Sequence, residues 1–324
     1  MITKALLALS LVTSVLTFSV PKRQSSVWNV ANFKSLITFG DSYTDENRLS
    51  YILGNNGTLP APGTYFPEGL NTASGGRTWP RFTVQYTGTT TNGIWIPQVD
   101  LYDYAVSGAV CSNNITPRLW IGTNDLGVGL FLTDAQIRGY TLTDYVECNF
   151  RVFDQLYASG GRYFVLFNDA PLQLAPLYAN DTLNGTGSNQ YWNPKPENHT
   201  AIAEKMHEYT TSVNTMFRYQ APYEMLIAGR YPDAHFAVFD VWQLLSDIYD
   251  NPTSYLNGSH PANVTGYEKH CNVNGTACTL MYDGTSSDSF MWFDELHPSE
   301  QTDRIIARTF VDVLNGNSSY ANYY

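Results

Sequence analysis

Residues 35–45 read SLITFGDSYTD, a short apolar run that ends at a glycine and leads directly into a serine. The run from Ser35 to Phe39 has the length and composition of a buried strand, and Gly40 indicates the turn that ends it. Ser42 follows this turn, so we expect its hydroxyl to be exposed at the carboxyl end of the strand. It is a candidate nucleophile if a base elsewhere in the chain can remove its proton.

Strand and helix patterns alternate along the rest of the chain. Short apolar runs predict further buried strands over 101–106, 118–121, 162–168 and 234–239. Apolar residues at helical spacing predict helices over 142–158, 199–217, 241–249 and 299–314. This order predicts an α/β fold with a mostly parallel sheet between two layers of helices, and ligand sites beyond the carboxyl ends of the strands. Segments 180–196 and 251–289, rich in Gly, Asn and Pro, are predicted to be surface excursions.

The composition indicates one large domain and argues against a nucleic-acid partner. With 324 residues and 43% hydrophobic content, the chain can bury one substantial core. Its formal net charge is -11. Nucleic-acid binders need clustered Lys and Arg to displace counterions from phosphates, so this charge excludes that class.

The first residues have the pattern of an export signal. Lys4 precedes the apolar stretch Ala5 to Leu16, and small residues follow it, which predicts a signal peptide over 1–19. The stretch is too short and too interrupted for a membrane anchor. The dibasic pair Lys22-Arg23 suggests a pro-segment over 20–23, and residues 20–324 are predicted to form a single domain.

Sequons and cysteines agree with export. Nine sequons, a density typical of a secreted glycoprotein, lie at Asn56, Asn114, Asn180, Asn184, Asn198, Asn257, Asn263, Asn274 and Asn317. The four cysteines are Cys111, Cys148, Cys271 and Cys278. In an oxidising compartment they are expected to form disulfides, with Cys271 to Cys278 as the favoured pair. Zinc is the alternative, but no matching ligand spacing accompanies them.

His297 is the candidate base. In Asp294-Glu295-Leu296-His297-Pro298, the aspartate lies three residues ahead of the histidine, close enough to bond the imidazole and select its tautomer. His297 also precedes a helix capped by Ser299, as a loop residue would. The remaining histidines, including His270, are expected to be surface or structural residues.

Two further strand ends offer hydrogen-bond donors for an oxyanion, which acyl transfer requires. Gly108, in Ala105-Val106-Ser107-Gly108-Ala109, allows close approach of a backbone N–H to a ligand. Asn124, in Gly122-Thr123-Asn124-Asp125, presents a side-chain amide. Each turn alone is ordinary, but four such signals in this order are not.

Together these four segments resemble a known family. FGDSYTD, AVSGA, GTND and DELH are similar to blocks one, two, three and five of the SGNH or GDSL hydrolases. The resemblance implies a three-layer α/β/α sandwich, flavodoxin-like, with Ser42, Asp294 and His297 as the triad. The N–H groups of Ser42 and Gly108 and the Asn124 amide would form the oxyanion hole. The implied mechanism is a two-step acyl transfer without metal or cofactor.

Longer segments narrow the resemblance. FGDSYTDENRLSYILGN, GGRTWPRF, LYDYAVSGAVCSNNITPR and FVLFNDAPLQLAPLY look like fungal secreted acetylesterases of carbohydrate esterase family sixteen. This likeness implies a secreted enzyme, expected to be a monomer, that removes acetyl groups from acetylated xylo-oligosaccharides. Trp79 is predicted to lie in a loop and face this substrate.

One departure from the family pattern leaves alternatives open. Only residues 109–117 connect Gly108 to the predicted strand 118–121, whereas parallel strands need a crossover of a dozen or more residues. Relatives in the family carry a longer segment there, which suggests a deletion or a mis-spliced gene between 109 and 118. The short crossover motivates one alternative, a catalytically impaired relative that only binds glycans. A second alternative, a secreted GDSL lipase or phospholipase, remains because the block motifs fix the chemistry but not the acyl chain.

Overall fold

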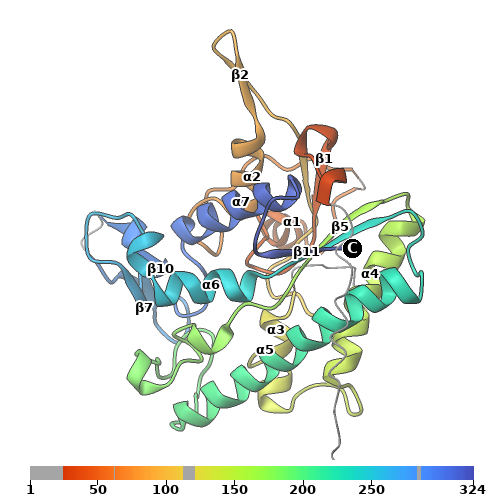
Figure 1. Cartoon of the computed structure of the whole chain (residues 1–324). Coiled ribbons are helices and arrows are strands. Elements are labelled where there is room, and N and C mark those ends of the chain that lie inside the picture. The colour runs from red at the N-terminus through yellow and green to blue at the C-terminus, as the bar shows by residue number, and fades with distance from the viewer. Residues whose placement is uncertain (1–24, 62, 112–120, 283–285) are drawn as a thin grey trace, which may run out of the picture.

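The computed structural model describes residues 25–61, 63–111, 121–282 and 286–324 as a mixed α/β structure (Figure 1). Its helices are α1 (Arg48–Gly54), α2 (Trp79–Thr87), α3 (Thr123–Leu126), α4 (Leu142–Ala158), α5 (His199–Pro222), α6 (Val241–Asp250) and α7 (Glu300–Leu314). Its strands are β1 (Ser35–Thr38), β2 (Thr89–Thr91), β3 (Ile94–Ile96), β4 (Asp100–Asp103), β5 (Tyr163–Phe167), β6 (His235–Phe239), β7 (Asn263–Tyr267), β8 (Lys269–Cys271), β9 (Cys278–Leu280), β10 (Phe290–Trp292) and β11 (Ala321–Tyr323).

Two groups of strands carry the parallel pairing that the sequence predicts. β1 pairs in parallel with β4, with Ser35 opposite Asp100. β5 pairs in parallel with β6, with Tyr163 opposite His235, and β11 joins the other edge of β6 in antiparallel orientation. Because neighbouring parallel strands end at the same edge of a sheet, the segments after β1 and β4 lie close together. These segments contain Ser42 and Gly108.

The helices begin and end close to where their periodicity predicts. α4 has the predicted bounds, and Thr141 and Asp144 form a capping box at its start. The Ser299 side chain caps α7 by accepting from the Thr302 N–H. α5 continues to Pro222, beyond the predicted end. In Figure 1, α2 packs on α7, and α4 lies beside α5.

The predicted excursion over 251–289 is more ordered than expected. β7 pairs in parallel with β10, and β8 and β9 form an antiparallel hairpin with Cys271 opposite Cys278. β8 and β9 have three residues each, too few to show the two-residue alternation that indicates a strand. The predicted surface excursion therefore contains short strands of its own.

All four cysteines form disulfides. Cys271 is bonded to Cys278, the pair that the sequence favoured, and Cys111 is bonded to Cys148. No free cysteine remains. The alternative of a cysteine-bound zinc ion is therefore excluded in this structure.

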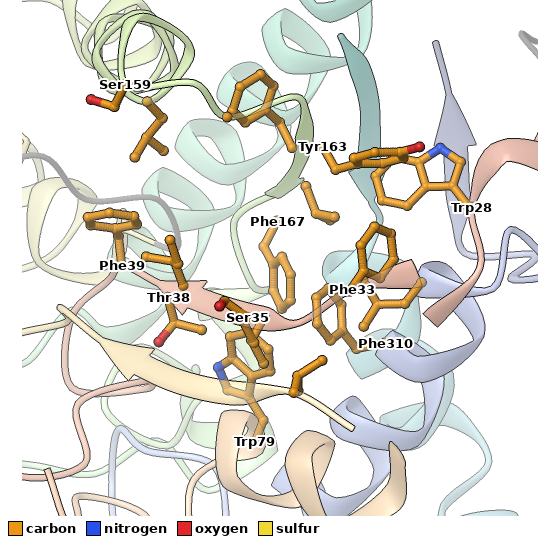
Figure 2. Close-up of a pocket in the computed structure, with 18 residues that line it drawn as sticks. Trp28, Phe33, Ser35, Thr38, Phe39, Trp79, Ser159, Tyr163, Phe167 and Phe310 are labelled. Atoms are coloured by element: carbon orange, nitrogen blue, oxygen red, sulfur yellow. The ribbon is translucent and has the colours of Figure 1, made fainter. Parts of the chain in front are cut away.

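An apolar cavity of about 260 Å³ lies between the edges of β1 and β5 (Figure 2). Ser35 and Thr38 line it from β1, and Tyr163 and Phe167 line it from β5. Among the described residues, β1 pairs only with β4 and β5 pairs only with β6.

Two predictions fall on residues outside the described ranges. The signal peptide over 1–19 lies wholly outside them, and of the predicted strand over 118–121 only Ile121 is described.

None of the helices in the described ranges combines the length and the apolar composition that a membrane span requires.

Candidate active site

Ser42 lies in a turn that follows β1 and is built by Asp41. The Asp41 carbonyl accepts hydrogen bonds from the N–H groups of Thr44 and Asp45, at 3.1 and 2.9 Å. Its side-chain Oδ1 accepts from the Tyr43 N–H at 3.1 Å. These bonds close the turn directly around Ser42, which is 7% exposed. The serine is thus held at the end of the strand by its neighbours' backbone.

Ser42, His297 and Asp294 form a hydrogen-bonded chain. His297 Nε2 lies 2.8 Å from Ser42 Oγ. On the other side of the ring, Nδ1 lies 3.0 and 3.1 Å from the two carboxylate oxygens of Asp294. A carboxylate at Nδ1 selects the tautomer that carries its proton there and leaves Nε2 free to accept the serine proton. The three residues therefore have the geometry of a nucleophile, its base and the residue that orients the base.

The loop over 294–297 is fixed by backbone contacts. Asp294 Oδ1 accepts from the N–H groups of Leu296 and His297, at 2.9 and 2.8 Å. The Leu296 carbonyl accepts from the Tyr43 hydroxyl at 2.6 Å, which connects this loop to the turn that carries Ser42. The Phe293 N–H donates to the His297 carbonyl at 2.8 Å. His297 is therefore positioned by its own loop and by Tyr43, the neighbour of Ser42.

The electrostatics favour an ionised Asp294 and a basic His297. Burial opposes the charge of Asp294, but the charge of His297 and hydrogen bonds from His297 and Tyr191 outweigh it and hold the pKa of this carboxyl below its usual value. Burial likewise opposes protonation of His297. The Asp294 carboxylate outweighs this effect and raises the pKa of the imidazole above 6.5.

Gly108 and Asn124 both lie at this site. Within the described residues, the N–H groups of Ser42 and Gly108 have no hydrogen-bond acceptor. Gly108 has a φ of +78°, a conformation that favours glycine. Asn124 Nδ2 lies 3.3 Å from Asp41 Oδ2 and 3.1 Å from the Ala109 carbonyl. The amide of Asn124 therefore reaches the turn that carries Ser42.

Asp45 links these two turns, a role that the sequence analysis did not assign. Its Oδ2 accepts from the Ser107 N–H at 2.7 Å and from the Ser107 hydroxyl at 2.9 Å. Oδ1 accepts from the Arg48 N–H at the start of α1. Asp45 thus holds the peptide before Gly108 against the segment that follows Ser42.

The prediction that Trp79 lies in a loop is wrong. Trp79 is the first residue of α2 and is only 3% exposed. Its ring packs against Phe167 and Phe310, with centroids 4.7 and 5.1 Å away, and its indole N–H donates to Thr44 Oγ1. The ring also lines the apolar cavity of Figure 2, and a contact between Trp79 and substrate stays a prediction.

The sequons within the described residues lie at the surface or close to it. The exposed ones are Asn56, Asn184, Asn198, Asn257, Asn274 and Asn317. Asn180 and Asn263 are half-buried. Asn114 lies outside the described residues. The exposed asparagines are sterically open to a glycan.

Two residues that sequence reasoning missed lie against the triad segment. Tyr191, from the predicted excursion over 180–196, contacts Asp294. His270, expected to lack an acidic partner, contacts Glu295, which is fully buried. Neither contact leaves a local sequence signal, because each joins segments far apart in the chain.

Among the described residues, no group of His, Cys, Asp and Glu has the arrangement of a metal site.

Comparisons with known proteins place the chain in a family. No protein-family model matches it. An acetylesterase of Hypocrea jecorina is 41% identical over 334 alignment positions, and the alignment covers 90% of this chain and 92% of that protein. An acetylesterase of Thermothelomyces thermophilus is 26% identical over 316 residues, covering 88% and 89%. The chain therefore belongs to the family that these fungal acetylesterases represent.

Proposed function

We propose that this protein is a serine esterase that hydrolyses acetyl esters. The observation that carries the proposal is the chain of contacts from Ser42 Oγ through His297 to Asp294. The names of the two fungal relatives support the acetyl group as the acyl part. The proposal includes the three-layer α/β/α sandwich of the SGNH hydrolases, which the parallel pairs β1 with β4 and β5 with β6 support.

The geometry allows a two-step reaction. Ser42 Oγ attacks the ester carbonyl while His297 Nε2 takes the hydroxyl proton, and the tetrahedral intermediate then collapses as His297 returns this proton to the leaving alcohol. Water attacks the acetyl-enzyme in the second step, again with His297 as base. Acetate leaves, and Ser42 regains its proton. No redox step occurs.

The oxyanion hole is assigned to the N–H groups of Ser42 and Gly108 and to the amide of Asn124. Both hydrogens of Asn124 Nδ2 have protein acceptors in the free site. The bond to Asp41, at 3.3 Å, is the longer of the two and is the one that a negatively charged oxygen would replace. The position of this amide argues against an impaired relative, because Asn124 reaches the nucleophile's turn despite the short connection before it.

The acyl group is tested with nitrophenyl esters of increasing chain length. Faster hydrolysis of the acetate than of the long-chain esters supports an acetylesterase, whereas the reverse order supports the lipase or phospholipase alternative. Acetate release from acetylated xylo-oligosaccharides then tests the carbohydrate. Binding of these oligosaccharides without any turnover would instead support a protein that only binds glycans.

Export belongs to the same proposal. The two disulfides fit an oxidising compartment, and most of the described sequons are exposed. Sequencing the amino terminus of protein recovered from the medium tests cleavage after residue 19 and trimming after Arg23. Retention of residues 1–19 on extracellular protein would contradict it.

We further propose that the connection between Ala109 and Gly122 is shorter than in relatives. The alignment to the Hypocrea jecorina protein spans 334 positions, more than the 324 residues of this chain, so that protein has residues with no counterpart here. Comparison of the transcript with genomic DNA tests this, and an uninterrupted reading frame with no skipped exon would exclude mis-splicing.

A further inference from the structure

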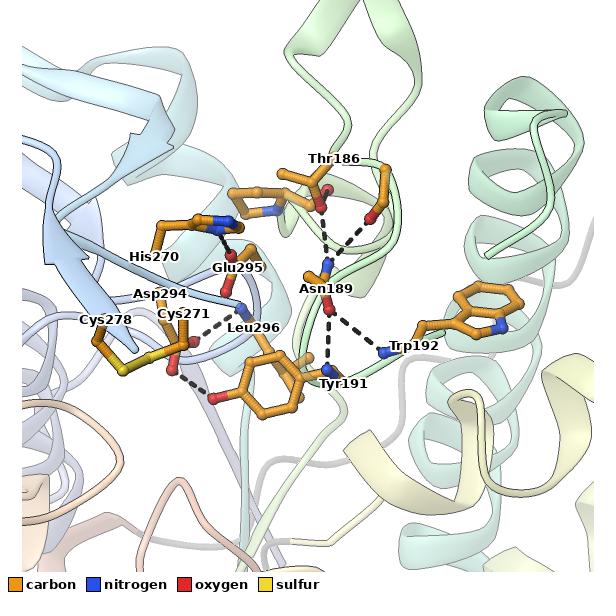
Figure 3. Close-up of polar contacts among 12 residues, drawn as sticks. Thr186, Asn189, Tyr191, Trp192, His270, Cys271, Cys278, Asp294, Glu295 and Leu296 are labelled. Carbon is orange, nitrogen blue, oxygen red and sulfur yellow. Dashed lines mark hydrogen bonds and ion pairs between the residues drawn. A yellow bond between two sulfur atoms is a disulfide. The ribbon is translucent and has the colours of Figure 1, made fainter. Parts of the chain in front are cut away.

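Tyr191 contacts both the orienting acid and the base of the candidate triad. Its hydroxyl donates to Asp294 Oδ2 at 2.5 Å (Figure 3). The same oxygen lies 3.3 Å from His297 Nδ1. The phenol ring packs edge-on against the imidazole, with the ring centroids 5.4 Å apart. Tyr191 therefore restrains these two side chains from outside the motif that contains them.

The turn that carries Tyr191 is built around a buried asparagine. Asn189, which is 1% exposed, accepts at Oδ1 from the N–H groups of Tyr191 and Trp192, at 2.9 and 3.3 Å. Its Nδ2 donates to Thr186 Oγ1 at 3.1 Å and to the Gly187 carbonyl at 3.2 Å. Figure 3 shows these bonds meeting at the Asn189 side chain, beside the loop that contains Asp294. Tyr191 is thus presented by an ordered turn.

The two oxygens of Asp294 have different partners. Oδ1 accepts from the N–H groups of Leu296 and His297. Oδ2 accepts from the Tyr191 hydroxyl, and His297 Nδ1 lies between the two oxygens. Without the phenol, the imidazole would be the one donor to Oδ2 among the residues that the structure describes. A buried carboxylate oxygen that loses a donor is destabilised, and the carboxylate gains freedom to rotate.

The direction of the bond from Tyr191 follows from the charges. Burial raises the pKa of the Tyr191 phenol far above its usual range, and the neighbouring Asp294 carboxylate raises it further. The phenol therefore keeps its proton while Asp294 is ionised. It can only donate to the carboxylate.

We propose that Tyr191 is a positioning residue of the esterase site, which fixes the Asp294 carboxylate in the orientation that holds the Nδ1–H tautomer of His297. The inference rests on the proposed function, since it assigns a role within that reaction. Tyr191 acts through Asp294 and needs no contact with substrate. The triad is thereby extended to a fourth residue that comes from a separate loop.

The surroundings of His297 determine what removing the phenol would do. The carboxylates that act on the imidazole are Asp294, Asp41 and Glu295, and the ring of Tyr43 lies 5.7 Å from its own. Replacement of Tyr191 by Phe changes none of these groups. The substitution removes one hydrogen bond that partly neutralises the Asp294 carboxylate. The negative charge of Asp294 then acts more strongly on His297 and raises the pKa of the imidazole.

The test compares wild type with Tyr191→Phe in the hydrolysis of nitrophenyl acetate. The variant keeps the ring against the imidazole and loses only the hydroxyl. We expect kcat to fall about tenfold with little change in KM, and the acid limb of the kcat/KM profile to move to higher pH. Tyr157→Phe is the matched control, because it also removes one tyrosine hydroxyl. The Tyr157 hydroxyl donates to the Pro232 carbonyl at 3.0 Å, so its loss should leave both kcat and the acid limb unchanged.

Asn189→Ala provides a second test that keeps the phenol and loosens its turn. Asn189→Ala should lower kcat and move the acid limb of the kcat/KM profile to higher pH. If Tyr191→Phe does not fold, the pH profile of Asn189→Ala tests the role of Tyr191 instead. A Tyr191→Phe enzyme with the wild-type kcat, or one that loses activity with no shift of the acid limb, would overturn the inference. Absence of Ser42-dependent hydrolysis in wild type would instead overturn the proposed function.

Discussion

His297 Nε2 lies 2.8 Å from Ser42 Oγ, although 255 positions separate the two residues in the chain. The turn that carries Ser42 and the loop that carries His297 are each closed by hydrogen bonds of their own. The Asp41 carbonyl closes the turn around Ser42, and Asp294 Oδ1 closes the loop that carries His297. The Tyr43 hydroxyl, bonded to the Leu296 carbonyl, joins the two segments. Ser42 and His297, the proposed nucleophile and base, are therefore arranged before any substrate binds, which would lower the entropic cost of reaching the transition state.

The pH dependence of activity should report the state of His297. Burial would lower its pKa, but the Asp294 carboxylate, with Asp41 and Glu295, raises it above 6.5. Because only the neutral imidazole can accept the Ser42 proton, kcat/KM should fall as the pH drops through this raised pKa. We expect the half-maximal point of the acid limb above pH 6.5. A limb below this value, measured while the protein remains folded by circular dichroism, would contradict the assignment.

Asp294→Asn should abolish most of the activity. The amide can donate to Nδ1, which favours the wrong tautomer of His297, and a loss of roughly 10⁴-fold in kcat is expected. Nitrophenyl acetate hydrolysis measures it, with the exposed Asp312→Asn variant as the control for loss of one acidic charge. Retention of more than a tenth of the wild-type kcat would indicate that a backbone carbonyl, not Asp294, orients His297.

Asn124→Ala should impair the chemical step more than binding. Removing one oxyanion donor typically lowers kcat by about 10²- to 10³-fold, because the donor acts on charge that develops in the transition state. We expect KM for nitrophenyl acetate to change little. Asn32→Ala, at an exposed position, is the control. A change confined to KM would show that the amide contacts the substrate rather than the oxyanion.

The two disulfides should contribute unequally to stability. The sequence separation is 37 for Cys111 and Cys148 but only 7 for Cys271 and Cys278. Loop-closure entropy predicts losses of about 4 and about 2.5 kcal/mol in the free energy of unfolding when each pair is replaced by serine. Urea denaturation of the two double variants measures the difference. A larger loss from the Cys271–Cys278 pair would mean that contacts of the β8–β9 hairpin outweigh the loop entropy.

Features with a local pattern could be predicted from the sequence. α4 shows a full helical period and has the predicted bounds. Ser42, Gly108, Asn124 and the pair Asp294 and His297 each occur in a short motif at the end of an element, and the structure brings all of them to one site. These predictions rested on helical periodicity, on residue types at the ends of elements and on the likeness of four motifs to the SGNH blocks.

Features that depend on tertiary contacts could not be predicted. Tyr191 reaches Asp294 across 103 positions, from a segment whose composition indicated only a surface loop. The short strands β8 and β9 left no alternating pattern. The contacts of the Trp79 ring with Phe167 and Phe310 likewise join segments far apart in the chain, so no local pattern indicates them.

The most direct test is hydrolysis of nitrophenyl acetate by the purified protein beside its Ser42→Ala variant. Ser50→Ala, at an exposed position in α1, is the control for loss of a hydroxyl. The account predicts turnover by wild type and by Ser50→Ala, and none above background by Ser42→Ala. Equal turnover by Ser42→Ala, or no turnover by folded wild type, would contradict it.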